Sequence, residues 1–412
     1  MSKLRVIFVD DDASILDGLQ RMLRKQSSEW EMHFVTSGQQ ALNLLDQDEF
    51  DVIVTDMQMP EMTGTELLEK LVQLHPEIGR IVLSGYADEE LAVRAIRVAH
   101  QFLVKPTDPI TLKTAIARAR PQRNVMSNDR IRTVVASCQQ LPIQPTYCAE
   151  LTHLLQSDEA DSRRVADVIS RDVSMSAKVL QLVNSSFFGV GRRISSIEMA
   201  VTLLGLMRIR ALVLREQIFR VCTMPRVIPH FSIEYIWDES LKVAELARLI
   251  SKAEGQKEDR PDQAFSAGLL HDIGLLLLAC LHEKFEQVIQ VVHKDRVPIC
   301  QAEMEILNVT HAEIGAYLLS LWGLPSRIIE AVASHHHPSD VAYDGLCAVT
   351  TTHMADVLTA QTSVPSEEDS IVPLLAPGLD RNYLKRCGLE DRLDHWTKIA
   401  QEFGRQQPVL SA

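Results

Sequence analysis

Short apolar runs alternate with helix-like stretches over residues 1–120, and this alternation limits the possible folds more than any other feature of the sequence. The apolar runs are rich in β-branched residues, which suits strands buried on both faces of a parallel sheet. They are Leu4–Val9, Met32–Thr36, Asp51–Thr55, Arg80–Ser84 and Gln101–Val104. The stretches with helical spacing are Ala13–Gln26, Gly38–Gln47, Gly64–His75 and Glu89–His100. We therefore predict an α/β domain built on a doubly wound, five-stranded parallel sheet.

The pattern changes near residue 122, where strand-like runs end and helical periodicity continues to the C-terminus. Pro121 and the polar segment QRNVMSND mark this boundary. The second part of the chain is therefore predicted to be all-α. The predicted division is an α/β domain over residues 1–121, a linker over 122–135, a helical domain over 136–340 and a C-terminal helical extension over 341–412.

Charge, hydropathy and cysteine usage narrow the expected location and partners. The formal net charge of −13 argues against a nucleic-acid-binding protein, so we expect no direct DNA binding. No signal-peptide core or bilayer-spanning run is found, so we expect no membrane association. The seven cysteines are scattered without a CxxC pair, which fits a reducing compartment. These features predict a cytoplasmic protein.

Acidic residues follow two of the predicted strands. Asp10 and Asp11 come directly after the first apolar run, and Asp56 comes after the third. Because functional groups gather at the carboxyl ends of parallel strands, these carboxylates are expected to face one another. Crowded carboxylates repel unless a cation lies among them, and a small hard cation such as Mg²⁺ fits oxygen ligands. The sequence therefore predicts a Mg²⁺ site at this edge of the sheet.

Two further strands end in residues suited to phosphate. Ser84 offers a hydroxyl to a phosphoryl oxygen, and Lys105 offers a point charge to phosphate or carboxylate. With a carboxylate nucleophile and a metal ion, they supply the positioning and charge neutralisation that phosphoryl transfer requires. Each residue alone has an ordinary structural explanation, such as a helix cap or a Lys–Pro turn. Their combination at successive strand ends predicts a phosphate-accepting pocket.

The segments VIFVDDDASIL, VTDMQMPEMTG, VLSGYAD and FLVKP resemble the motifs of response-regulator receiver domains, over about residues 3–120. The resemblance implies a flavodoxin-like receiver fold in which Asp56 is the phosphoacceptor. It implies that Ser84 is the switch hydroxyl, that Phe102 rotates with it, and that Lys105 is the lysine of the family. The implied Mg²⁺ ligands are Asp10, Asp11, Asp56 and the backbone carbonyl of Gln58.

The helical region carries histidines and aspartates that could share a metal. The HD pair is His271–Asp272 in AGLLHDIGLLLL, and His311, His335, His336 and Asp356 follow it. Imidazole and carboxylate ligands suit Fe, Mn or Zn, and such a site would activate water for attack on a phosphodiester. The alternative is structural, because buried His and Asp side chains can hydrogen-bond to one another and fix helix packing. Both interpretations remain open from the residues alone.

The segments LPIQPTYCAEL, VISRDVSMSAKVLQLVNSSFFG and SSIEMAVTLLGLMRIRALVL resemble the HDOD branch of the HD superfamily, over about residues 130–340. HDOD domains are generally taken as non-hydrolytic regulatory modules, whereas relatives with a GYP signature degrade cyclic di-GMP. Glu239 stands where those relatives have a metal-binding His, Leu275 stands where they have Lys, and the GYP signature is missing. We therefore do not expect a second divalent metal, although a Glu ligand would allow one. The alternative metal set is Glu239, His271, Asp272, His311, His335, His336 and Asp356.

These resemblances together imply a two-component response regulator that acts in a phosphorelay. A sensor histidine kinase or phosphotransfer protein would phosphorylate Asp56. The helical HDOD module would then signal to an unknown downstream protein through docking, release or homodimer formation. The alternative is a phosphorylation-gated, metal-dependent phosphohydrolase resembling a cyclic di-GMP phosphodiesterase. A third possibility is a phosphate sink whose helical domain only tunes dephosphorylation.

Overall fold

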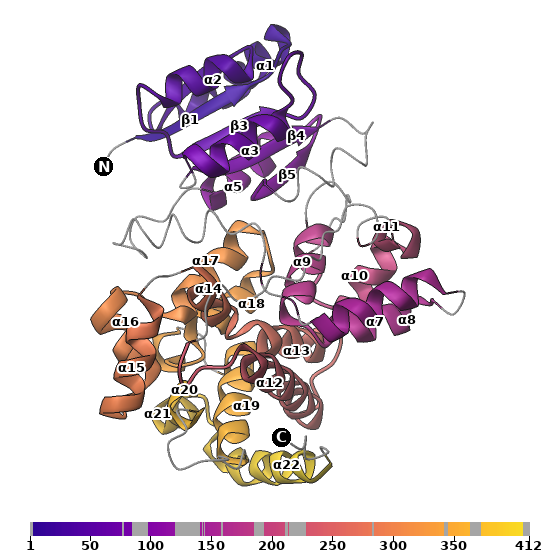
Figure 1. Ribbon diagram of the computed structural model, residues 1–412, viewed down its shortest axis with the longest axis vertical. Helices are drawn as coiled ribbons and strands as arrows, with labels where there is room; N and C mark the ends of the chain where they lie inside the picture. The colour runs from indigo at the N-terminus through magenta and orange to yellow at the C-terminus, as the bar shows by residue number, and fades with distance from the viewer. Residues whose placement is uncertain are drawn as a thin grey trace.

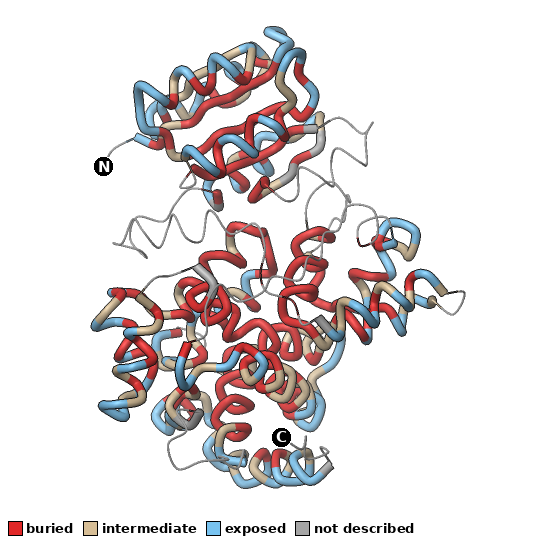
Figure 2. The backbone as a smooth tube through the Cα atoms, in the orientation of Figure 1, coloured by how far each residue is buried: buried red, intermediate tan, exposed pale blue. Residues whose placement is uncertain are grey.

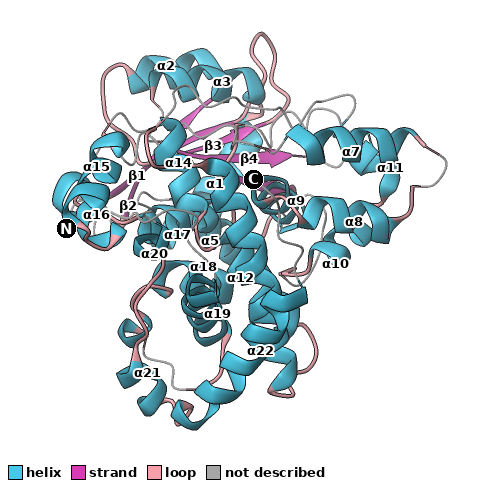
Figure 3. Cartoon of the chain, turned by 60° about the horizontal axis from the view of Figure 1, so that its bottom comes forward, coloured by secondary structure: helices cyan, strands magenta, loops and turns pink. Residues whose placement is uncertain are grey.

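The computed structural model contains a sheet-bearing domain and a larger array of helices (Figure 1), so both predicted fold classes are confirmed. The structure describes residues 3–75, 78–84, 98–119, 141, 143, 145–157, 160–184, 193–210, 213, 228–281, 284–341, 345–362 and 372–406. The predicted linker over 122–135 and most of the predicted helix Glu89–His100 lie outside these residues. Strands occur in one group only among the described residues, and the other regular elements are helices joined by loops (Figure 3).

The sheet has five parallel strands in the order β2-β1-β3-β4-β5. This is the predicted doubly wound topology, since the chain moves outward from β1 in both directions. The predicted and observed strand ends differ by at most two residues. The strands are β1 (Leu4–Val9), β2 (Trp30–Val35), β3 (Val52–Asp56), β4 (Gly79–Ser84) and β5 (Gln101–Val104).

Helices cover both faces of the sheet. The apolar residues of α1 (Ala13–Leu23) and α5 (Pro109–Ala119) pack on one face, and those of α2 (Gly38–Leu45) and α3 (Gly64–Leu74) pack on the other. The side chains of Asp12, Ser37 and Thr63 cap the N-termini of α1, α2 and α3. The predicted helix that reaches Gln26 therefore consists of α1 and a short 3₁₀ turn, Arg24–Gln26.

The remaining described chain is helical. Its longest helix, α12 (Ile233–Ala253), packs against α13 (Arg260–Leu270) and α19 (Ala348–Thr362). The other helices are α7 (Pro145–Gln156), α8 (Ser162–Ser170), α9 (Val173–Asn184), α10 (Ile197–Leu204), α11 (Leu206–Arg210), α14 (Ile273–Leu281), α15 (Phe285–Asp295), α16 (Ile299–Leu307), α17 (His311–Leu321), α18 (Ser326–Ser334), α20 (Val372–Leu375), α21 (Arg381–Arg386) and α22 (Leu393–Gln406), with 3₁₀ turns at Pro338–Asp340 and Glu390–Arg392.

Two apolar cores hold these helices together, and Figure 2 shows their buried sides in red. The larger core involves helices from α7 to α20. The second core joins α12, α13 and α19 to α21 and α22, and it buries Tyr383 and Trp396 completely. The helices after residue 341 therefore pack directly on the elements that precede them. Among the residues that the structure describes, none of the helices is both long and apolar enough to cross a bilayer.

Candidate functional site

Three charged residues meet at the carboxyl ends of the central strands. Asp10 follows β1, Asp56 ends β3 and Lys105 follows β5. The Lys105 ammonium nitrogen lies 2.6 Å from Asp10 Oδ2 and also contacts Asp56 Oδ1. Both carboxylates are buried. The sheet thus brings together the acceptor, an acidic partner and the lysine that the sequence predicts at this edge.

The backbone around Asp56 fixes the position of its carboxylate. The Gln58 amide donates a hydrogen bond to Asp56 Oδ2 at 2.9 Å. Gly64, the first residue of α3, donates to the carbonyl of Met57 at 2.9 Å. A Cβ atom at Gly64 would lie 1.9 Å from the Asp56 carbonyl oxygen, so only glycine lets α3 begin this close to the site.

The charge balance of this pocket keeps Lys105 protonated. Burial lowers the pKa of Lys105, but hydrogen bonds to Asp10 and Asp56 outweigh burial and raise the pKa above its usual value. Burial also raises the pKa of Asp10, against the opposing effect of Lys105. The single ammonium of Lys105 lies between two buried carboxylates and balances only part of their negative charge. The pocket therefore keeps a net negative charge.

For the other predicted receiver residues, the structure gives the position in the chain but not every side chain. Asp11 is exposed immediately beside Asp10, and Gln58 is exposed beside Asp56. Ser84 ends β4 and pairs in register with Val104, while Phe102 lies within β5. The side chains of Ser84 and Phe102 lie outside the described residues. The carboxylates and the Gln58 carbonyl are oxygen donors, which is the donor type that Mg²⁺ prefers, so the residues present fit this ion.

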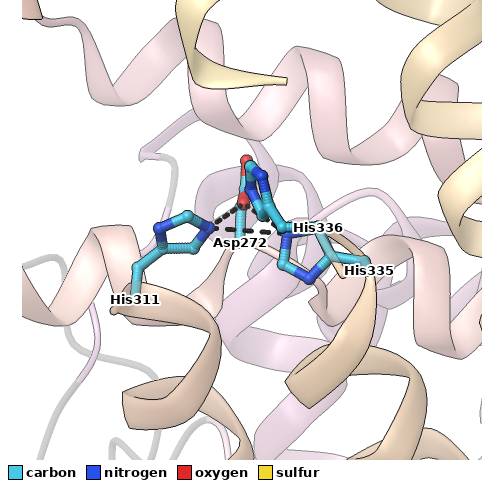
Figure 4. A group of neighbouring side chains, drawn as sticks. All are labelled: Asp272, His311, His335 and His336. Atoms are coloured by element: carbon cyan, nitrogen blue, oxygen red, sulfur yellow. Dashed lines mark hydrogen bonds and ion pairs between the residues drawn. The ribbon is translucent and has the colours of Figure 1, made fainter. Parts of the chain in front are cut away.

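A second cluster lies at the centre of the helical domain, where Asp272 meets three histidines. Asp272 Oδ2 lies 3.2 Å from His271 Nε2, and Asp272 Oδ1 lies 3.3 Å from His311 Nε2 and 3.6 Å from His335 Nε2. Figure 4 shows Asp272, His311, His335 and His336 converging on one point. The HD pair connects α13 to α14, His311 begins α17, and His335 and His336 follow α18. Asp356, on α19, lies 3.7 Å from His271 Nε2.

The orientation of the three imidazole rings is set from outside the cluster. His271 Nδ1 lies 2.7 Å from the Gly268 carbonyl oxygen, and His335 Nδ1 lies 2.8 Å from the Val332 carbonyl oxygen. His311 Nδ1 lies 2.8 Å from Glu303 Oε2. Since each of these oxygens accepts a hydrogen bond, Nδ1 carries the hydrogen and is the donor, and Nε2 of a neutral ring directs its lone pair at Asp272. Carbonyl or carboxylate partners of this kind are typical of metal-ligating histidines.

Lone pairs facing a carboxylate require a proton or a cation between them. His336 Nε2 is buried and has no hydrogen-bond partner among the described residues, and Asp272 Oδ1 has only its ion-pair contacts with His311 and His335, neither of which has hydrogen-bond geometry. Potential ligand atoms of Asp272, His311, His335 and His336 all lie within 4.8 Å of one another. His271, His335 and Asp356 form an overlapping group of three whose potential ligand atoms also lie within 4.8 Å of one another. Because buried polar groups without partners are costly, the donor set fits a divalent metal.

Without a metal, protons would occupy the cluster. Burial lowers the pKa of His271, but Asp272 and Asp356 outweigh burial and raise it to about 9. Burial likewise lowers the pKa of His311, while Glu303 and Asp272 raise it to about 10. Burial raises the pKa of Asp356 to about 8. A bound metal would displace these protons, because ligands must be deprotonated to coordinate.

One predicted ligand has a different partner, and one supporting residue was missed. Glu239 is buried on α12 with its Oε2 atom 3.3 Å from Lys242 Nζ, and it belongs to neither of these donor groups. Glu303, which orients His311, was not predicted because it lies on the preceding helix, outside the histidine motifs. The sequence did contain a signal for Glu303. Glu303 lies three residues after Cys300 and four before Leu307, so helical spacing places this acidic residue on the apolar face of α16.

Comparisons with known proteins agree with this division into two parts. Residues 6–117 match the response regulator receiver domain, and residues 141–338 match the HDOD domain. An uncharacterized protein of Treponema pallidum is 25% identical over 227 residues, which are 54% of this chain and 43% of that protein. The hydrogenase transcriptional regulatory protein HoxA of Cupriavidus necator is 35% identical over 116 residues, which are 28% of this chain and 23% of HoxA. The chain therefore spans less than half of the length of these curated relatives.

Among solved structures, a virulence factor from Campylobacter jejuni is similar in fold. The two sequences are 20% identical, and the match covers 69% of this chain and 99% of the Campylobacter protein, with a TM-score of 0.50. Receiver domains generally bind Mg²⁺, in agreement with the oxygen donors found at the strand ends. The chain is therefore a member of the proteins in which a response regulator receiver domain is followed by an HDOD domain.

Proposed function

We propose that this protein is a response regulator that accepts a phosphoryl group on Asp56 and signals through protein contacts of its HDOD domain. The observation that carries this proposal is the convergence of Asp10, Asp56 and Lys105 at the strand ends. The donor would be a sensor histidine kinase or a phosphotransfer protein. Asp10, Asp11, Asp56 and the Gln58 carbonyl would hold Mg²⁺, which neutralises charge on the phosphoryl oxygens when it is bound.

The chain's own groups suit the transfer step. A carboxylate oxygen of Asp56 forms the new bond to phosphorus, while the bond to the donor breaks and its electron pair leaves with the donor. The Gln58 amide holds one Asp56 oxygen, and Lys105 provides positive charge beside the other. A phosphoryl group adds about −1.5 to −2 charges beside Lys105, so we expect the contacts of Lys105 to change after transfer.

Replacement of the acceptor tests the proposal. Asp56→Asn should abolish labelling of the full-length protein by acetyl phosphate, because the amide is a poor nucleophile. Asp46→Asn is the matched control, since Asp46 is an exposed carboxylate of the same domain, and it should be labelled normally. Intact-protein mass spectrometry would detect the added phosphoryl group. Persistent labelling of Asp56→Asn would show that another residue is the acceptor.

The histidine cluster favours a second candidate function, metal binding by the HDOD domain. The specific observation is that three Nε2 atoms, each oriented by a partner on Nδ1, face Asp272. Asp272, His311, His335 and His336 would hold the ion, with His271 and Asp356 beside them. A metal bound there would activate water for phosphodiester hydrolysis, which would make the protein a phosphorylation-gated phosphohydrolase resembling a cyclic di-GMP phosphodiesterase.

Metal content separates this candidate from a purely structural cluster. Full-length protein incubated with Mn²⁺ or Fe²⁺ and then desalted should retain stoichiometric metal, and His335→Ala should lose it. His337→Ala is the matched control, because His337 is exposed two residues away and should leave the metal in place. Absence of metal from the unmodified protein would show that the cluster serves only to fix the packing of the helices. Retained metal without phosphodiester turnover would assign it to regulation.

We also place the protein in the cytoplasm, with no direct binding to DNA. The cysteines Cys148, Cys300, Cys347 and Cys387 are free thiols, which supports a reducing compartment. The net charge of −13 opposes association with a polyanion.

A further inference from the structure

The C-terminus of α17 leaves one backbone carbonyl for a partner outside the helix. The turn that follows is a Schellman motif around Gly323, which has a φ of +74°. In this turn, Leu324 N donates to Leu319 O at 3.1 Å, Gly323 N donates to Ser320 O at 3.0 Å, and Trp322 N donates to Leu318 O at 3.0 Å. These bonds satisfy three of the last four carbonyls of α17. The fourth belongs to Leu321, a buried residue.

The receiver domain supplies the missing donor. Gln101, the first residue of β5, donates from Nε2 to the Leu321 carbonyl oxygen at 2.7 Å. Figure 1 shows α5 at the end of the receiver domain that faces α17, and these two helices are in contact. A side chain of one domain therefore caps a helix of the other.

The turn fits closely between Gln101 and a second side chain. Arg193 Nη1 donates to the Leu324 carbonyl oxygen at 3.0 Å. A Cβ atom at position 323 would lie 3.0 Å from Gln101 Nε2 and 3.4 Å from Arg193 Nη1. Gly323 is thus required both by its positive φ and by the approach of these two side chains. The contact between Gln101 and the end of α17 therefore depends on the specific shape of this turn.

The two elements that meet at this cap each lead to one of the candidate sites. β5 runs from Gln101 to Val104, and the next residue, Lys105, contacts Asp10 and Asp56. α17 runs from His311, in the histidine cluster, to Leu321 at the cap. A strand and a helix are stiff over these lengths, so a displacement at one end moves the other end.

We propose that the Gln101 cap on α17 is an interdomain contact that phosphorylation of Asp56 loosens. This inference rests on the proposed function of Asp56. The cap is present in a structure where Lys105 pairs with the carboxylate of Asp56 itself. A phosphoryl group adds charge beside Lys105, and Lys105 is continuous with β5. Because N–H···O hydrogen bonds span only about 2.7–3.2 Å and weaken steeply at angles below about 120°, a small shift of β5 is enough to release Leu321.

Amide hydrogen exchange in the full-length protein tests the cap. Gln101→Ala should speed exchange in peptides covering residues 315–325 roughly two- to tenfold, the range expected for loss of one hydrogen bond. Gln39→Ala is the matched control, because Gln39 is an exposed glutamine on α2 and its loss should leave these peptides unchanged. Unmodified protein treated with acetyl phosphate should approach the exchange of Gln101→Ala.

The outcomes separate this inference from the function on which it rests. If Gln101→Ala exchanges like the unmodified protein, the cap is absent in solution and the inference is wrong. If intact mass shows phosphorylation but exchange at 315–325 does not change, Asp56 is an acceptor that does not control the cap. If no phosphoryl group is added, the proposed function fails, while the Gln101→Ala comparison still reports on the cap itself.

Discussion

Glu303 shows how one buried side chain can determine the chemistry of its neighbour. Both of its oxygens lie within 3.0 Å of His311 Nδ1, and Oε2 also accepts a hydrogen bond from the His311 backbone amide. Both residues are fully buried. Glu303 thereby fixes the tautomer that turns His311 Nε2 toward Asp272.

Removing Glu303 should therefore cost more than its own contacts suggest. Glu303→Ala leaves a buried imidazole without its acceptor, and we expect it to lower the free energy of unfolding by about 3–5 kcal/mol. Glu305→Ala, an exposed change on the same helix, should alter it by no more than about 0.5 kcal/mol. Urea unfolding followed by circular dichroism measures both values. Equal effects of the two substitutions would show that the pair is not formed in solution.

At the scale of a helix, the position of α3 depends on the residue with which it begins, Gly64. The helix approaches the Asp56 carbonyl so closely that Gly64 has no room for a side chain, whereas Gly18 on α1 has no neighbouring atom within 4 Å of an added Cβ. Gly64→Ala should destabilise the receiver domain by about 1–3 kcal/mol through overpacking. Gly18→Ala should stabilise it by about 0.5–1 kcal/mol through helix propensity.

Thermal unfolding and acetyl phosphate labelling would follow the two glycine variants. We expect slower labelling only in Gly64→Ala, because α3 must shift away from Asp56 to accommodate the methyl group. If both alanine substitutions raised the unfolding temperature, α3 would not approach the Asp56 carbonyl as closely as the structure shows.

The elements of the receiver were predictable because periodicity is local. A run such as DVIVT indicates a buried strand. Thr63 and Glu66 form the capping box at the start of α3, and both residues belong to one short segment. The histidine cluster was predictable in composition from its motifs. Its geometry was not, because the orientation of His311 depends on Glu303 and the end of α17 depends on Gln101. Contacts between distant segments leave no periodic signal in a single sequence.

At the scale of the whole molecule, the helices beyond residue 341 complete the helical domain. The HDOD match ends at residue 338, yet α19 supplies Asp356 to the histidine cluster and packs on α12, α13 and α18. α22 in turn is anchored by Glu254, whose Oε1 atom accepts hydrogen bonds from Arg392 at 2.7 Å and from Trp396 Nε1 at 2.8 Å. The receiver has separate cores and does not depend on this anchor.

Loss of the α22 anchor should consequently affect one domain and spare the other. Trp396→Ala removes a fully buried ring and should destabilise the helical domain by about 3–5 kcal/mol. His395→Ala, at the exposed neighbouring position, should have almost no effect. Labelling of Asp56 by acetyl phosphate should persist in both variants, since the proposed acceptor and its contacts with Lys105 lie wholly within the receiver. If Trp396→Ala abolished labelling together with helical stability, the two domains would fold as one cooperative unit, and the Gln101 contact would be part of that unit's core and could not serve as a releasable cap.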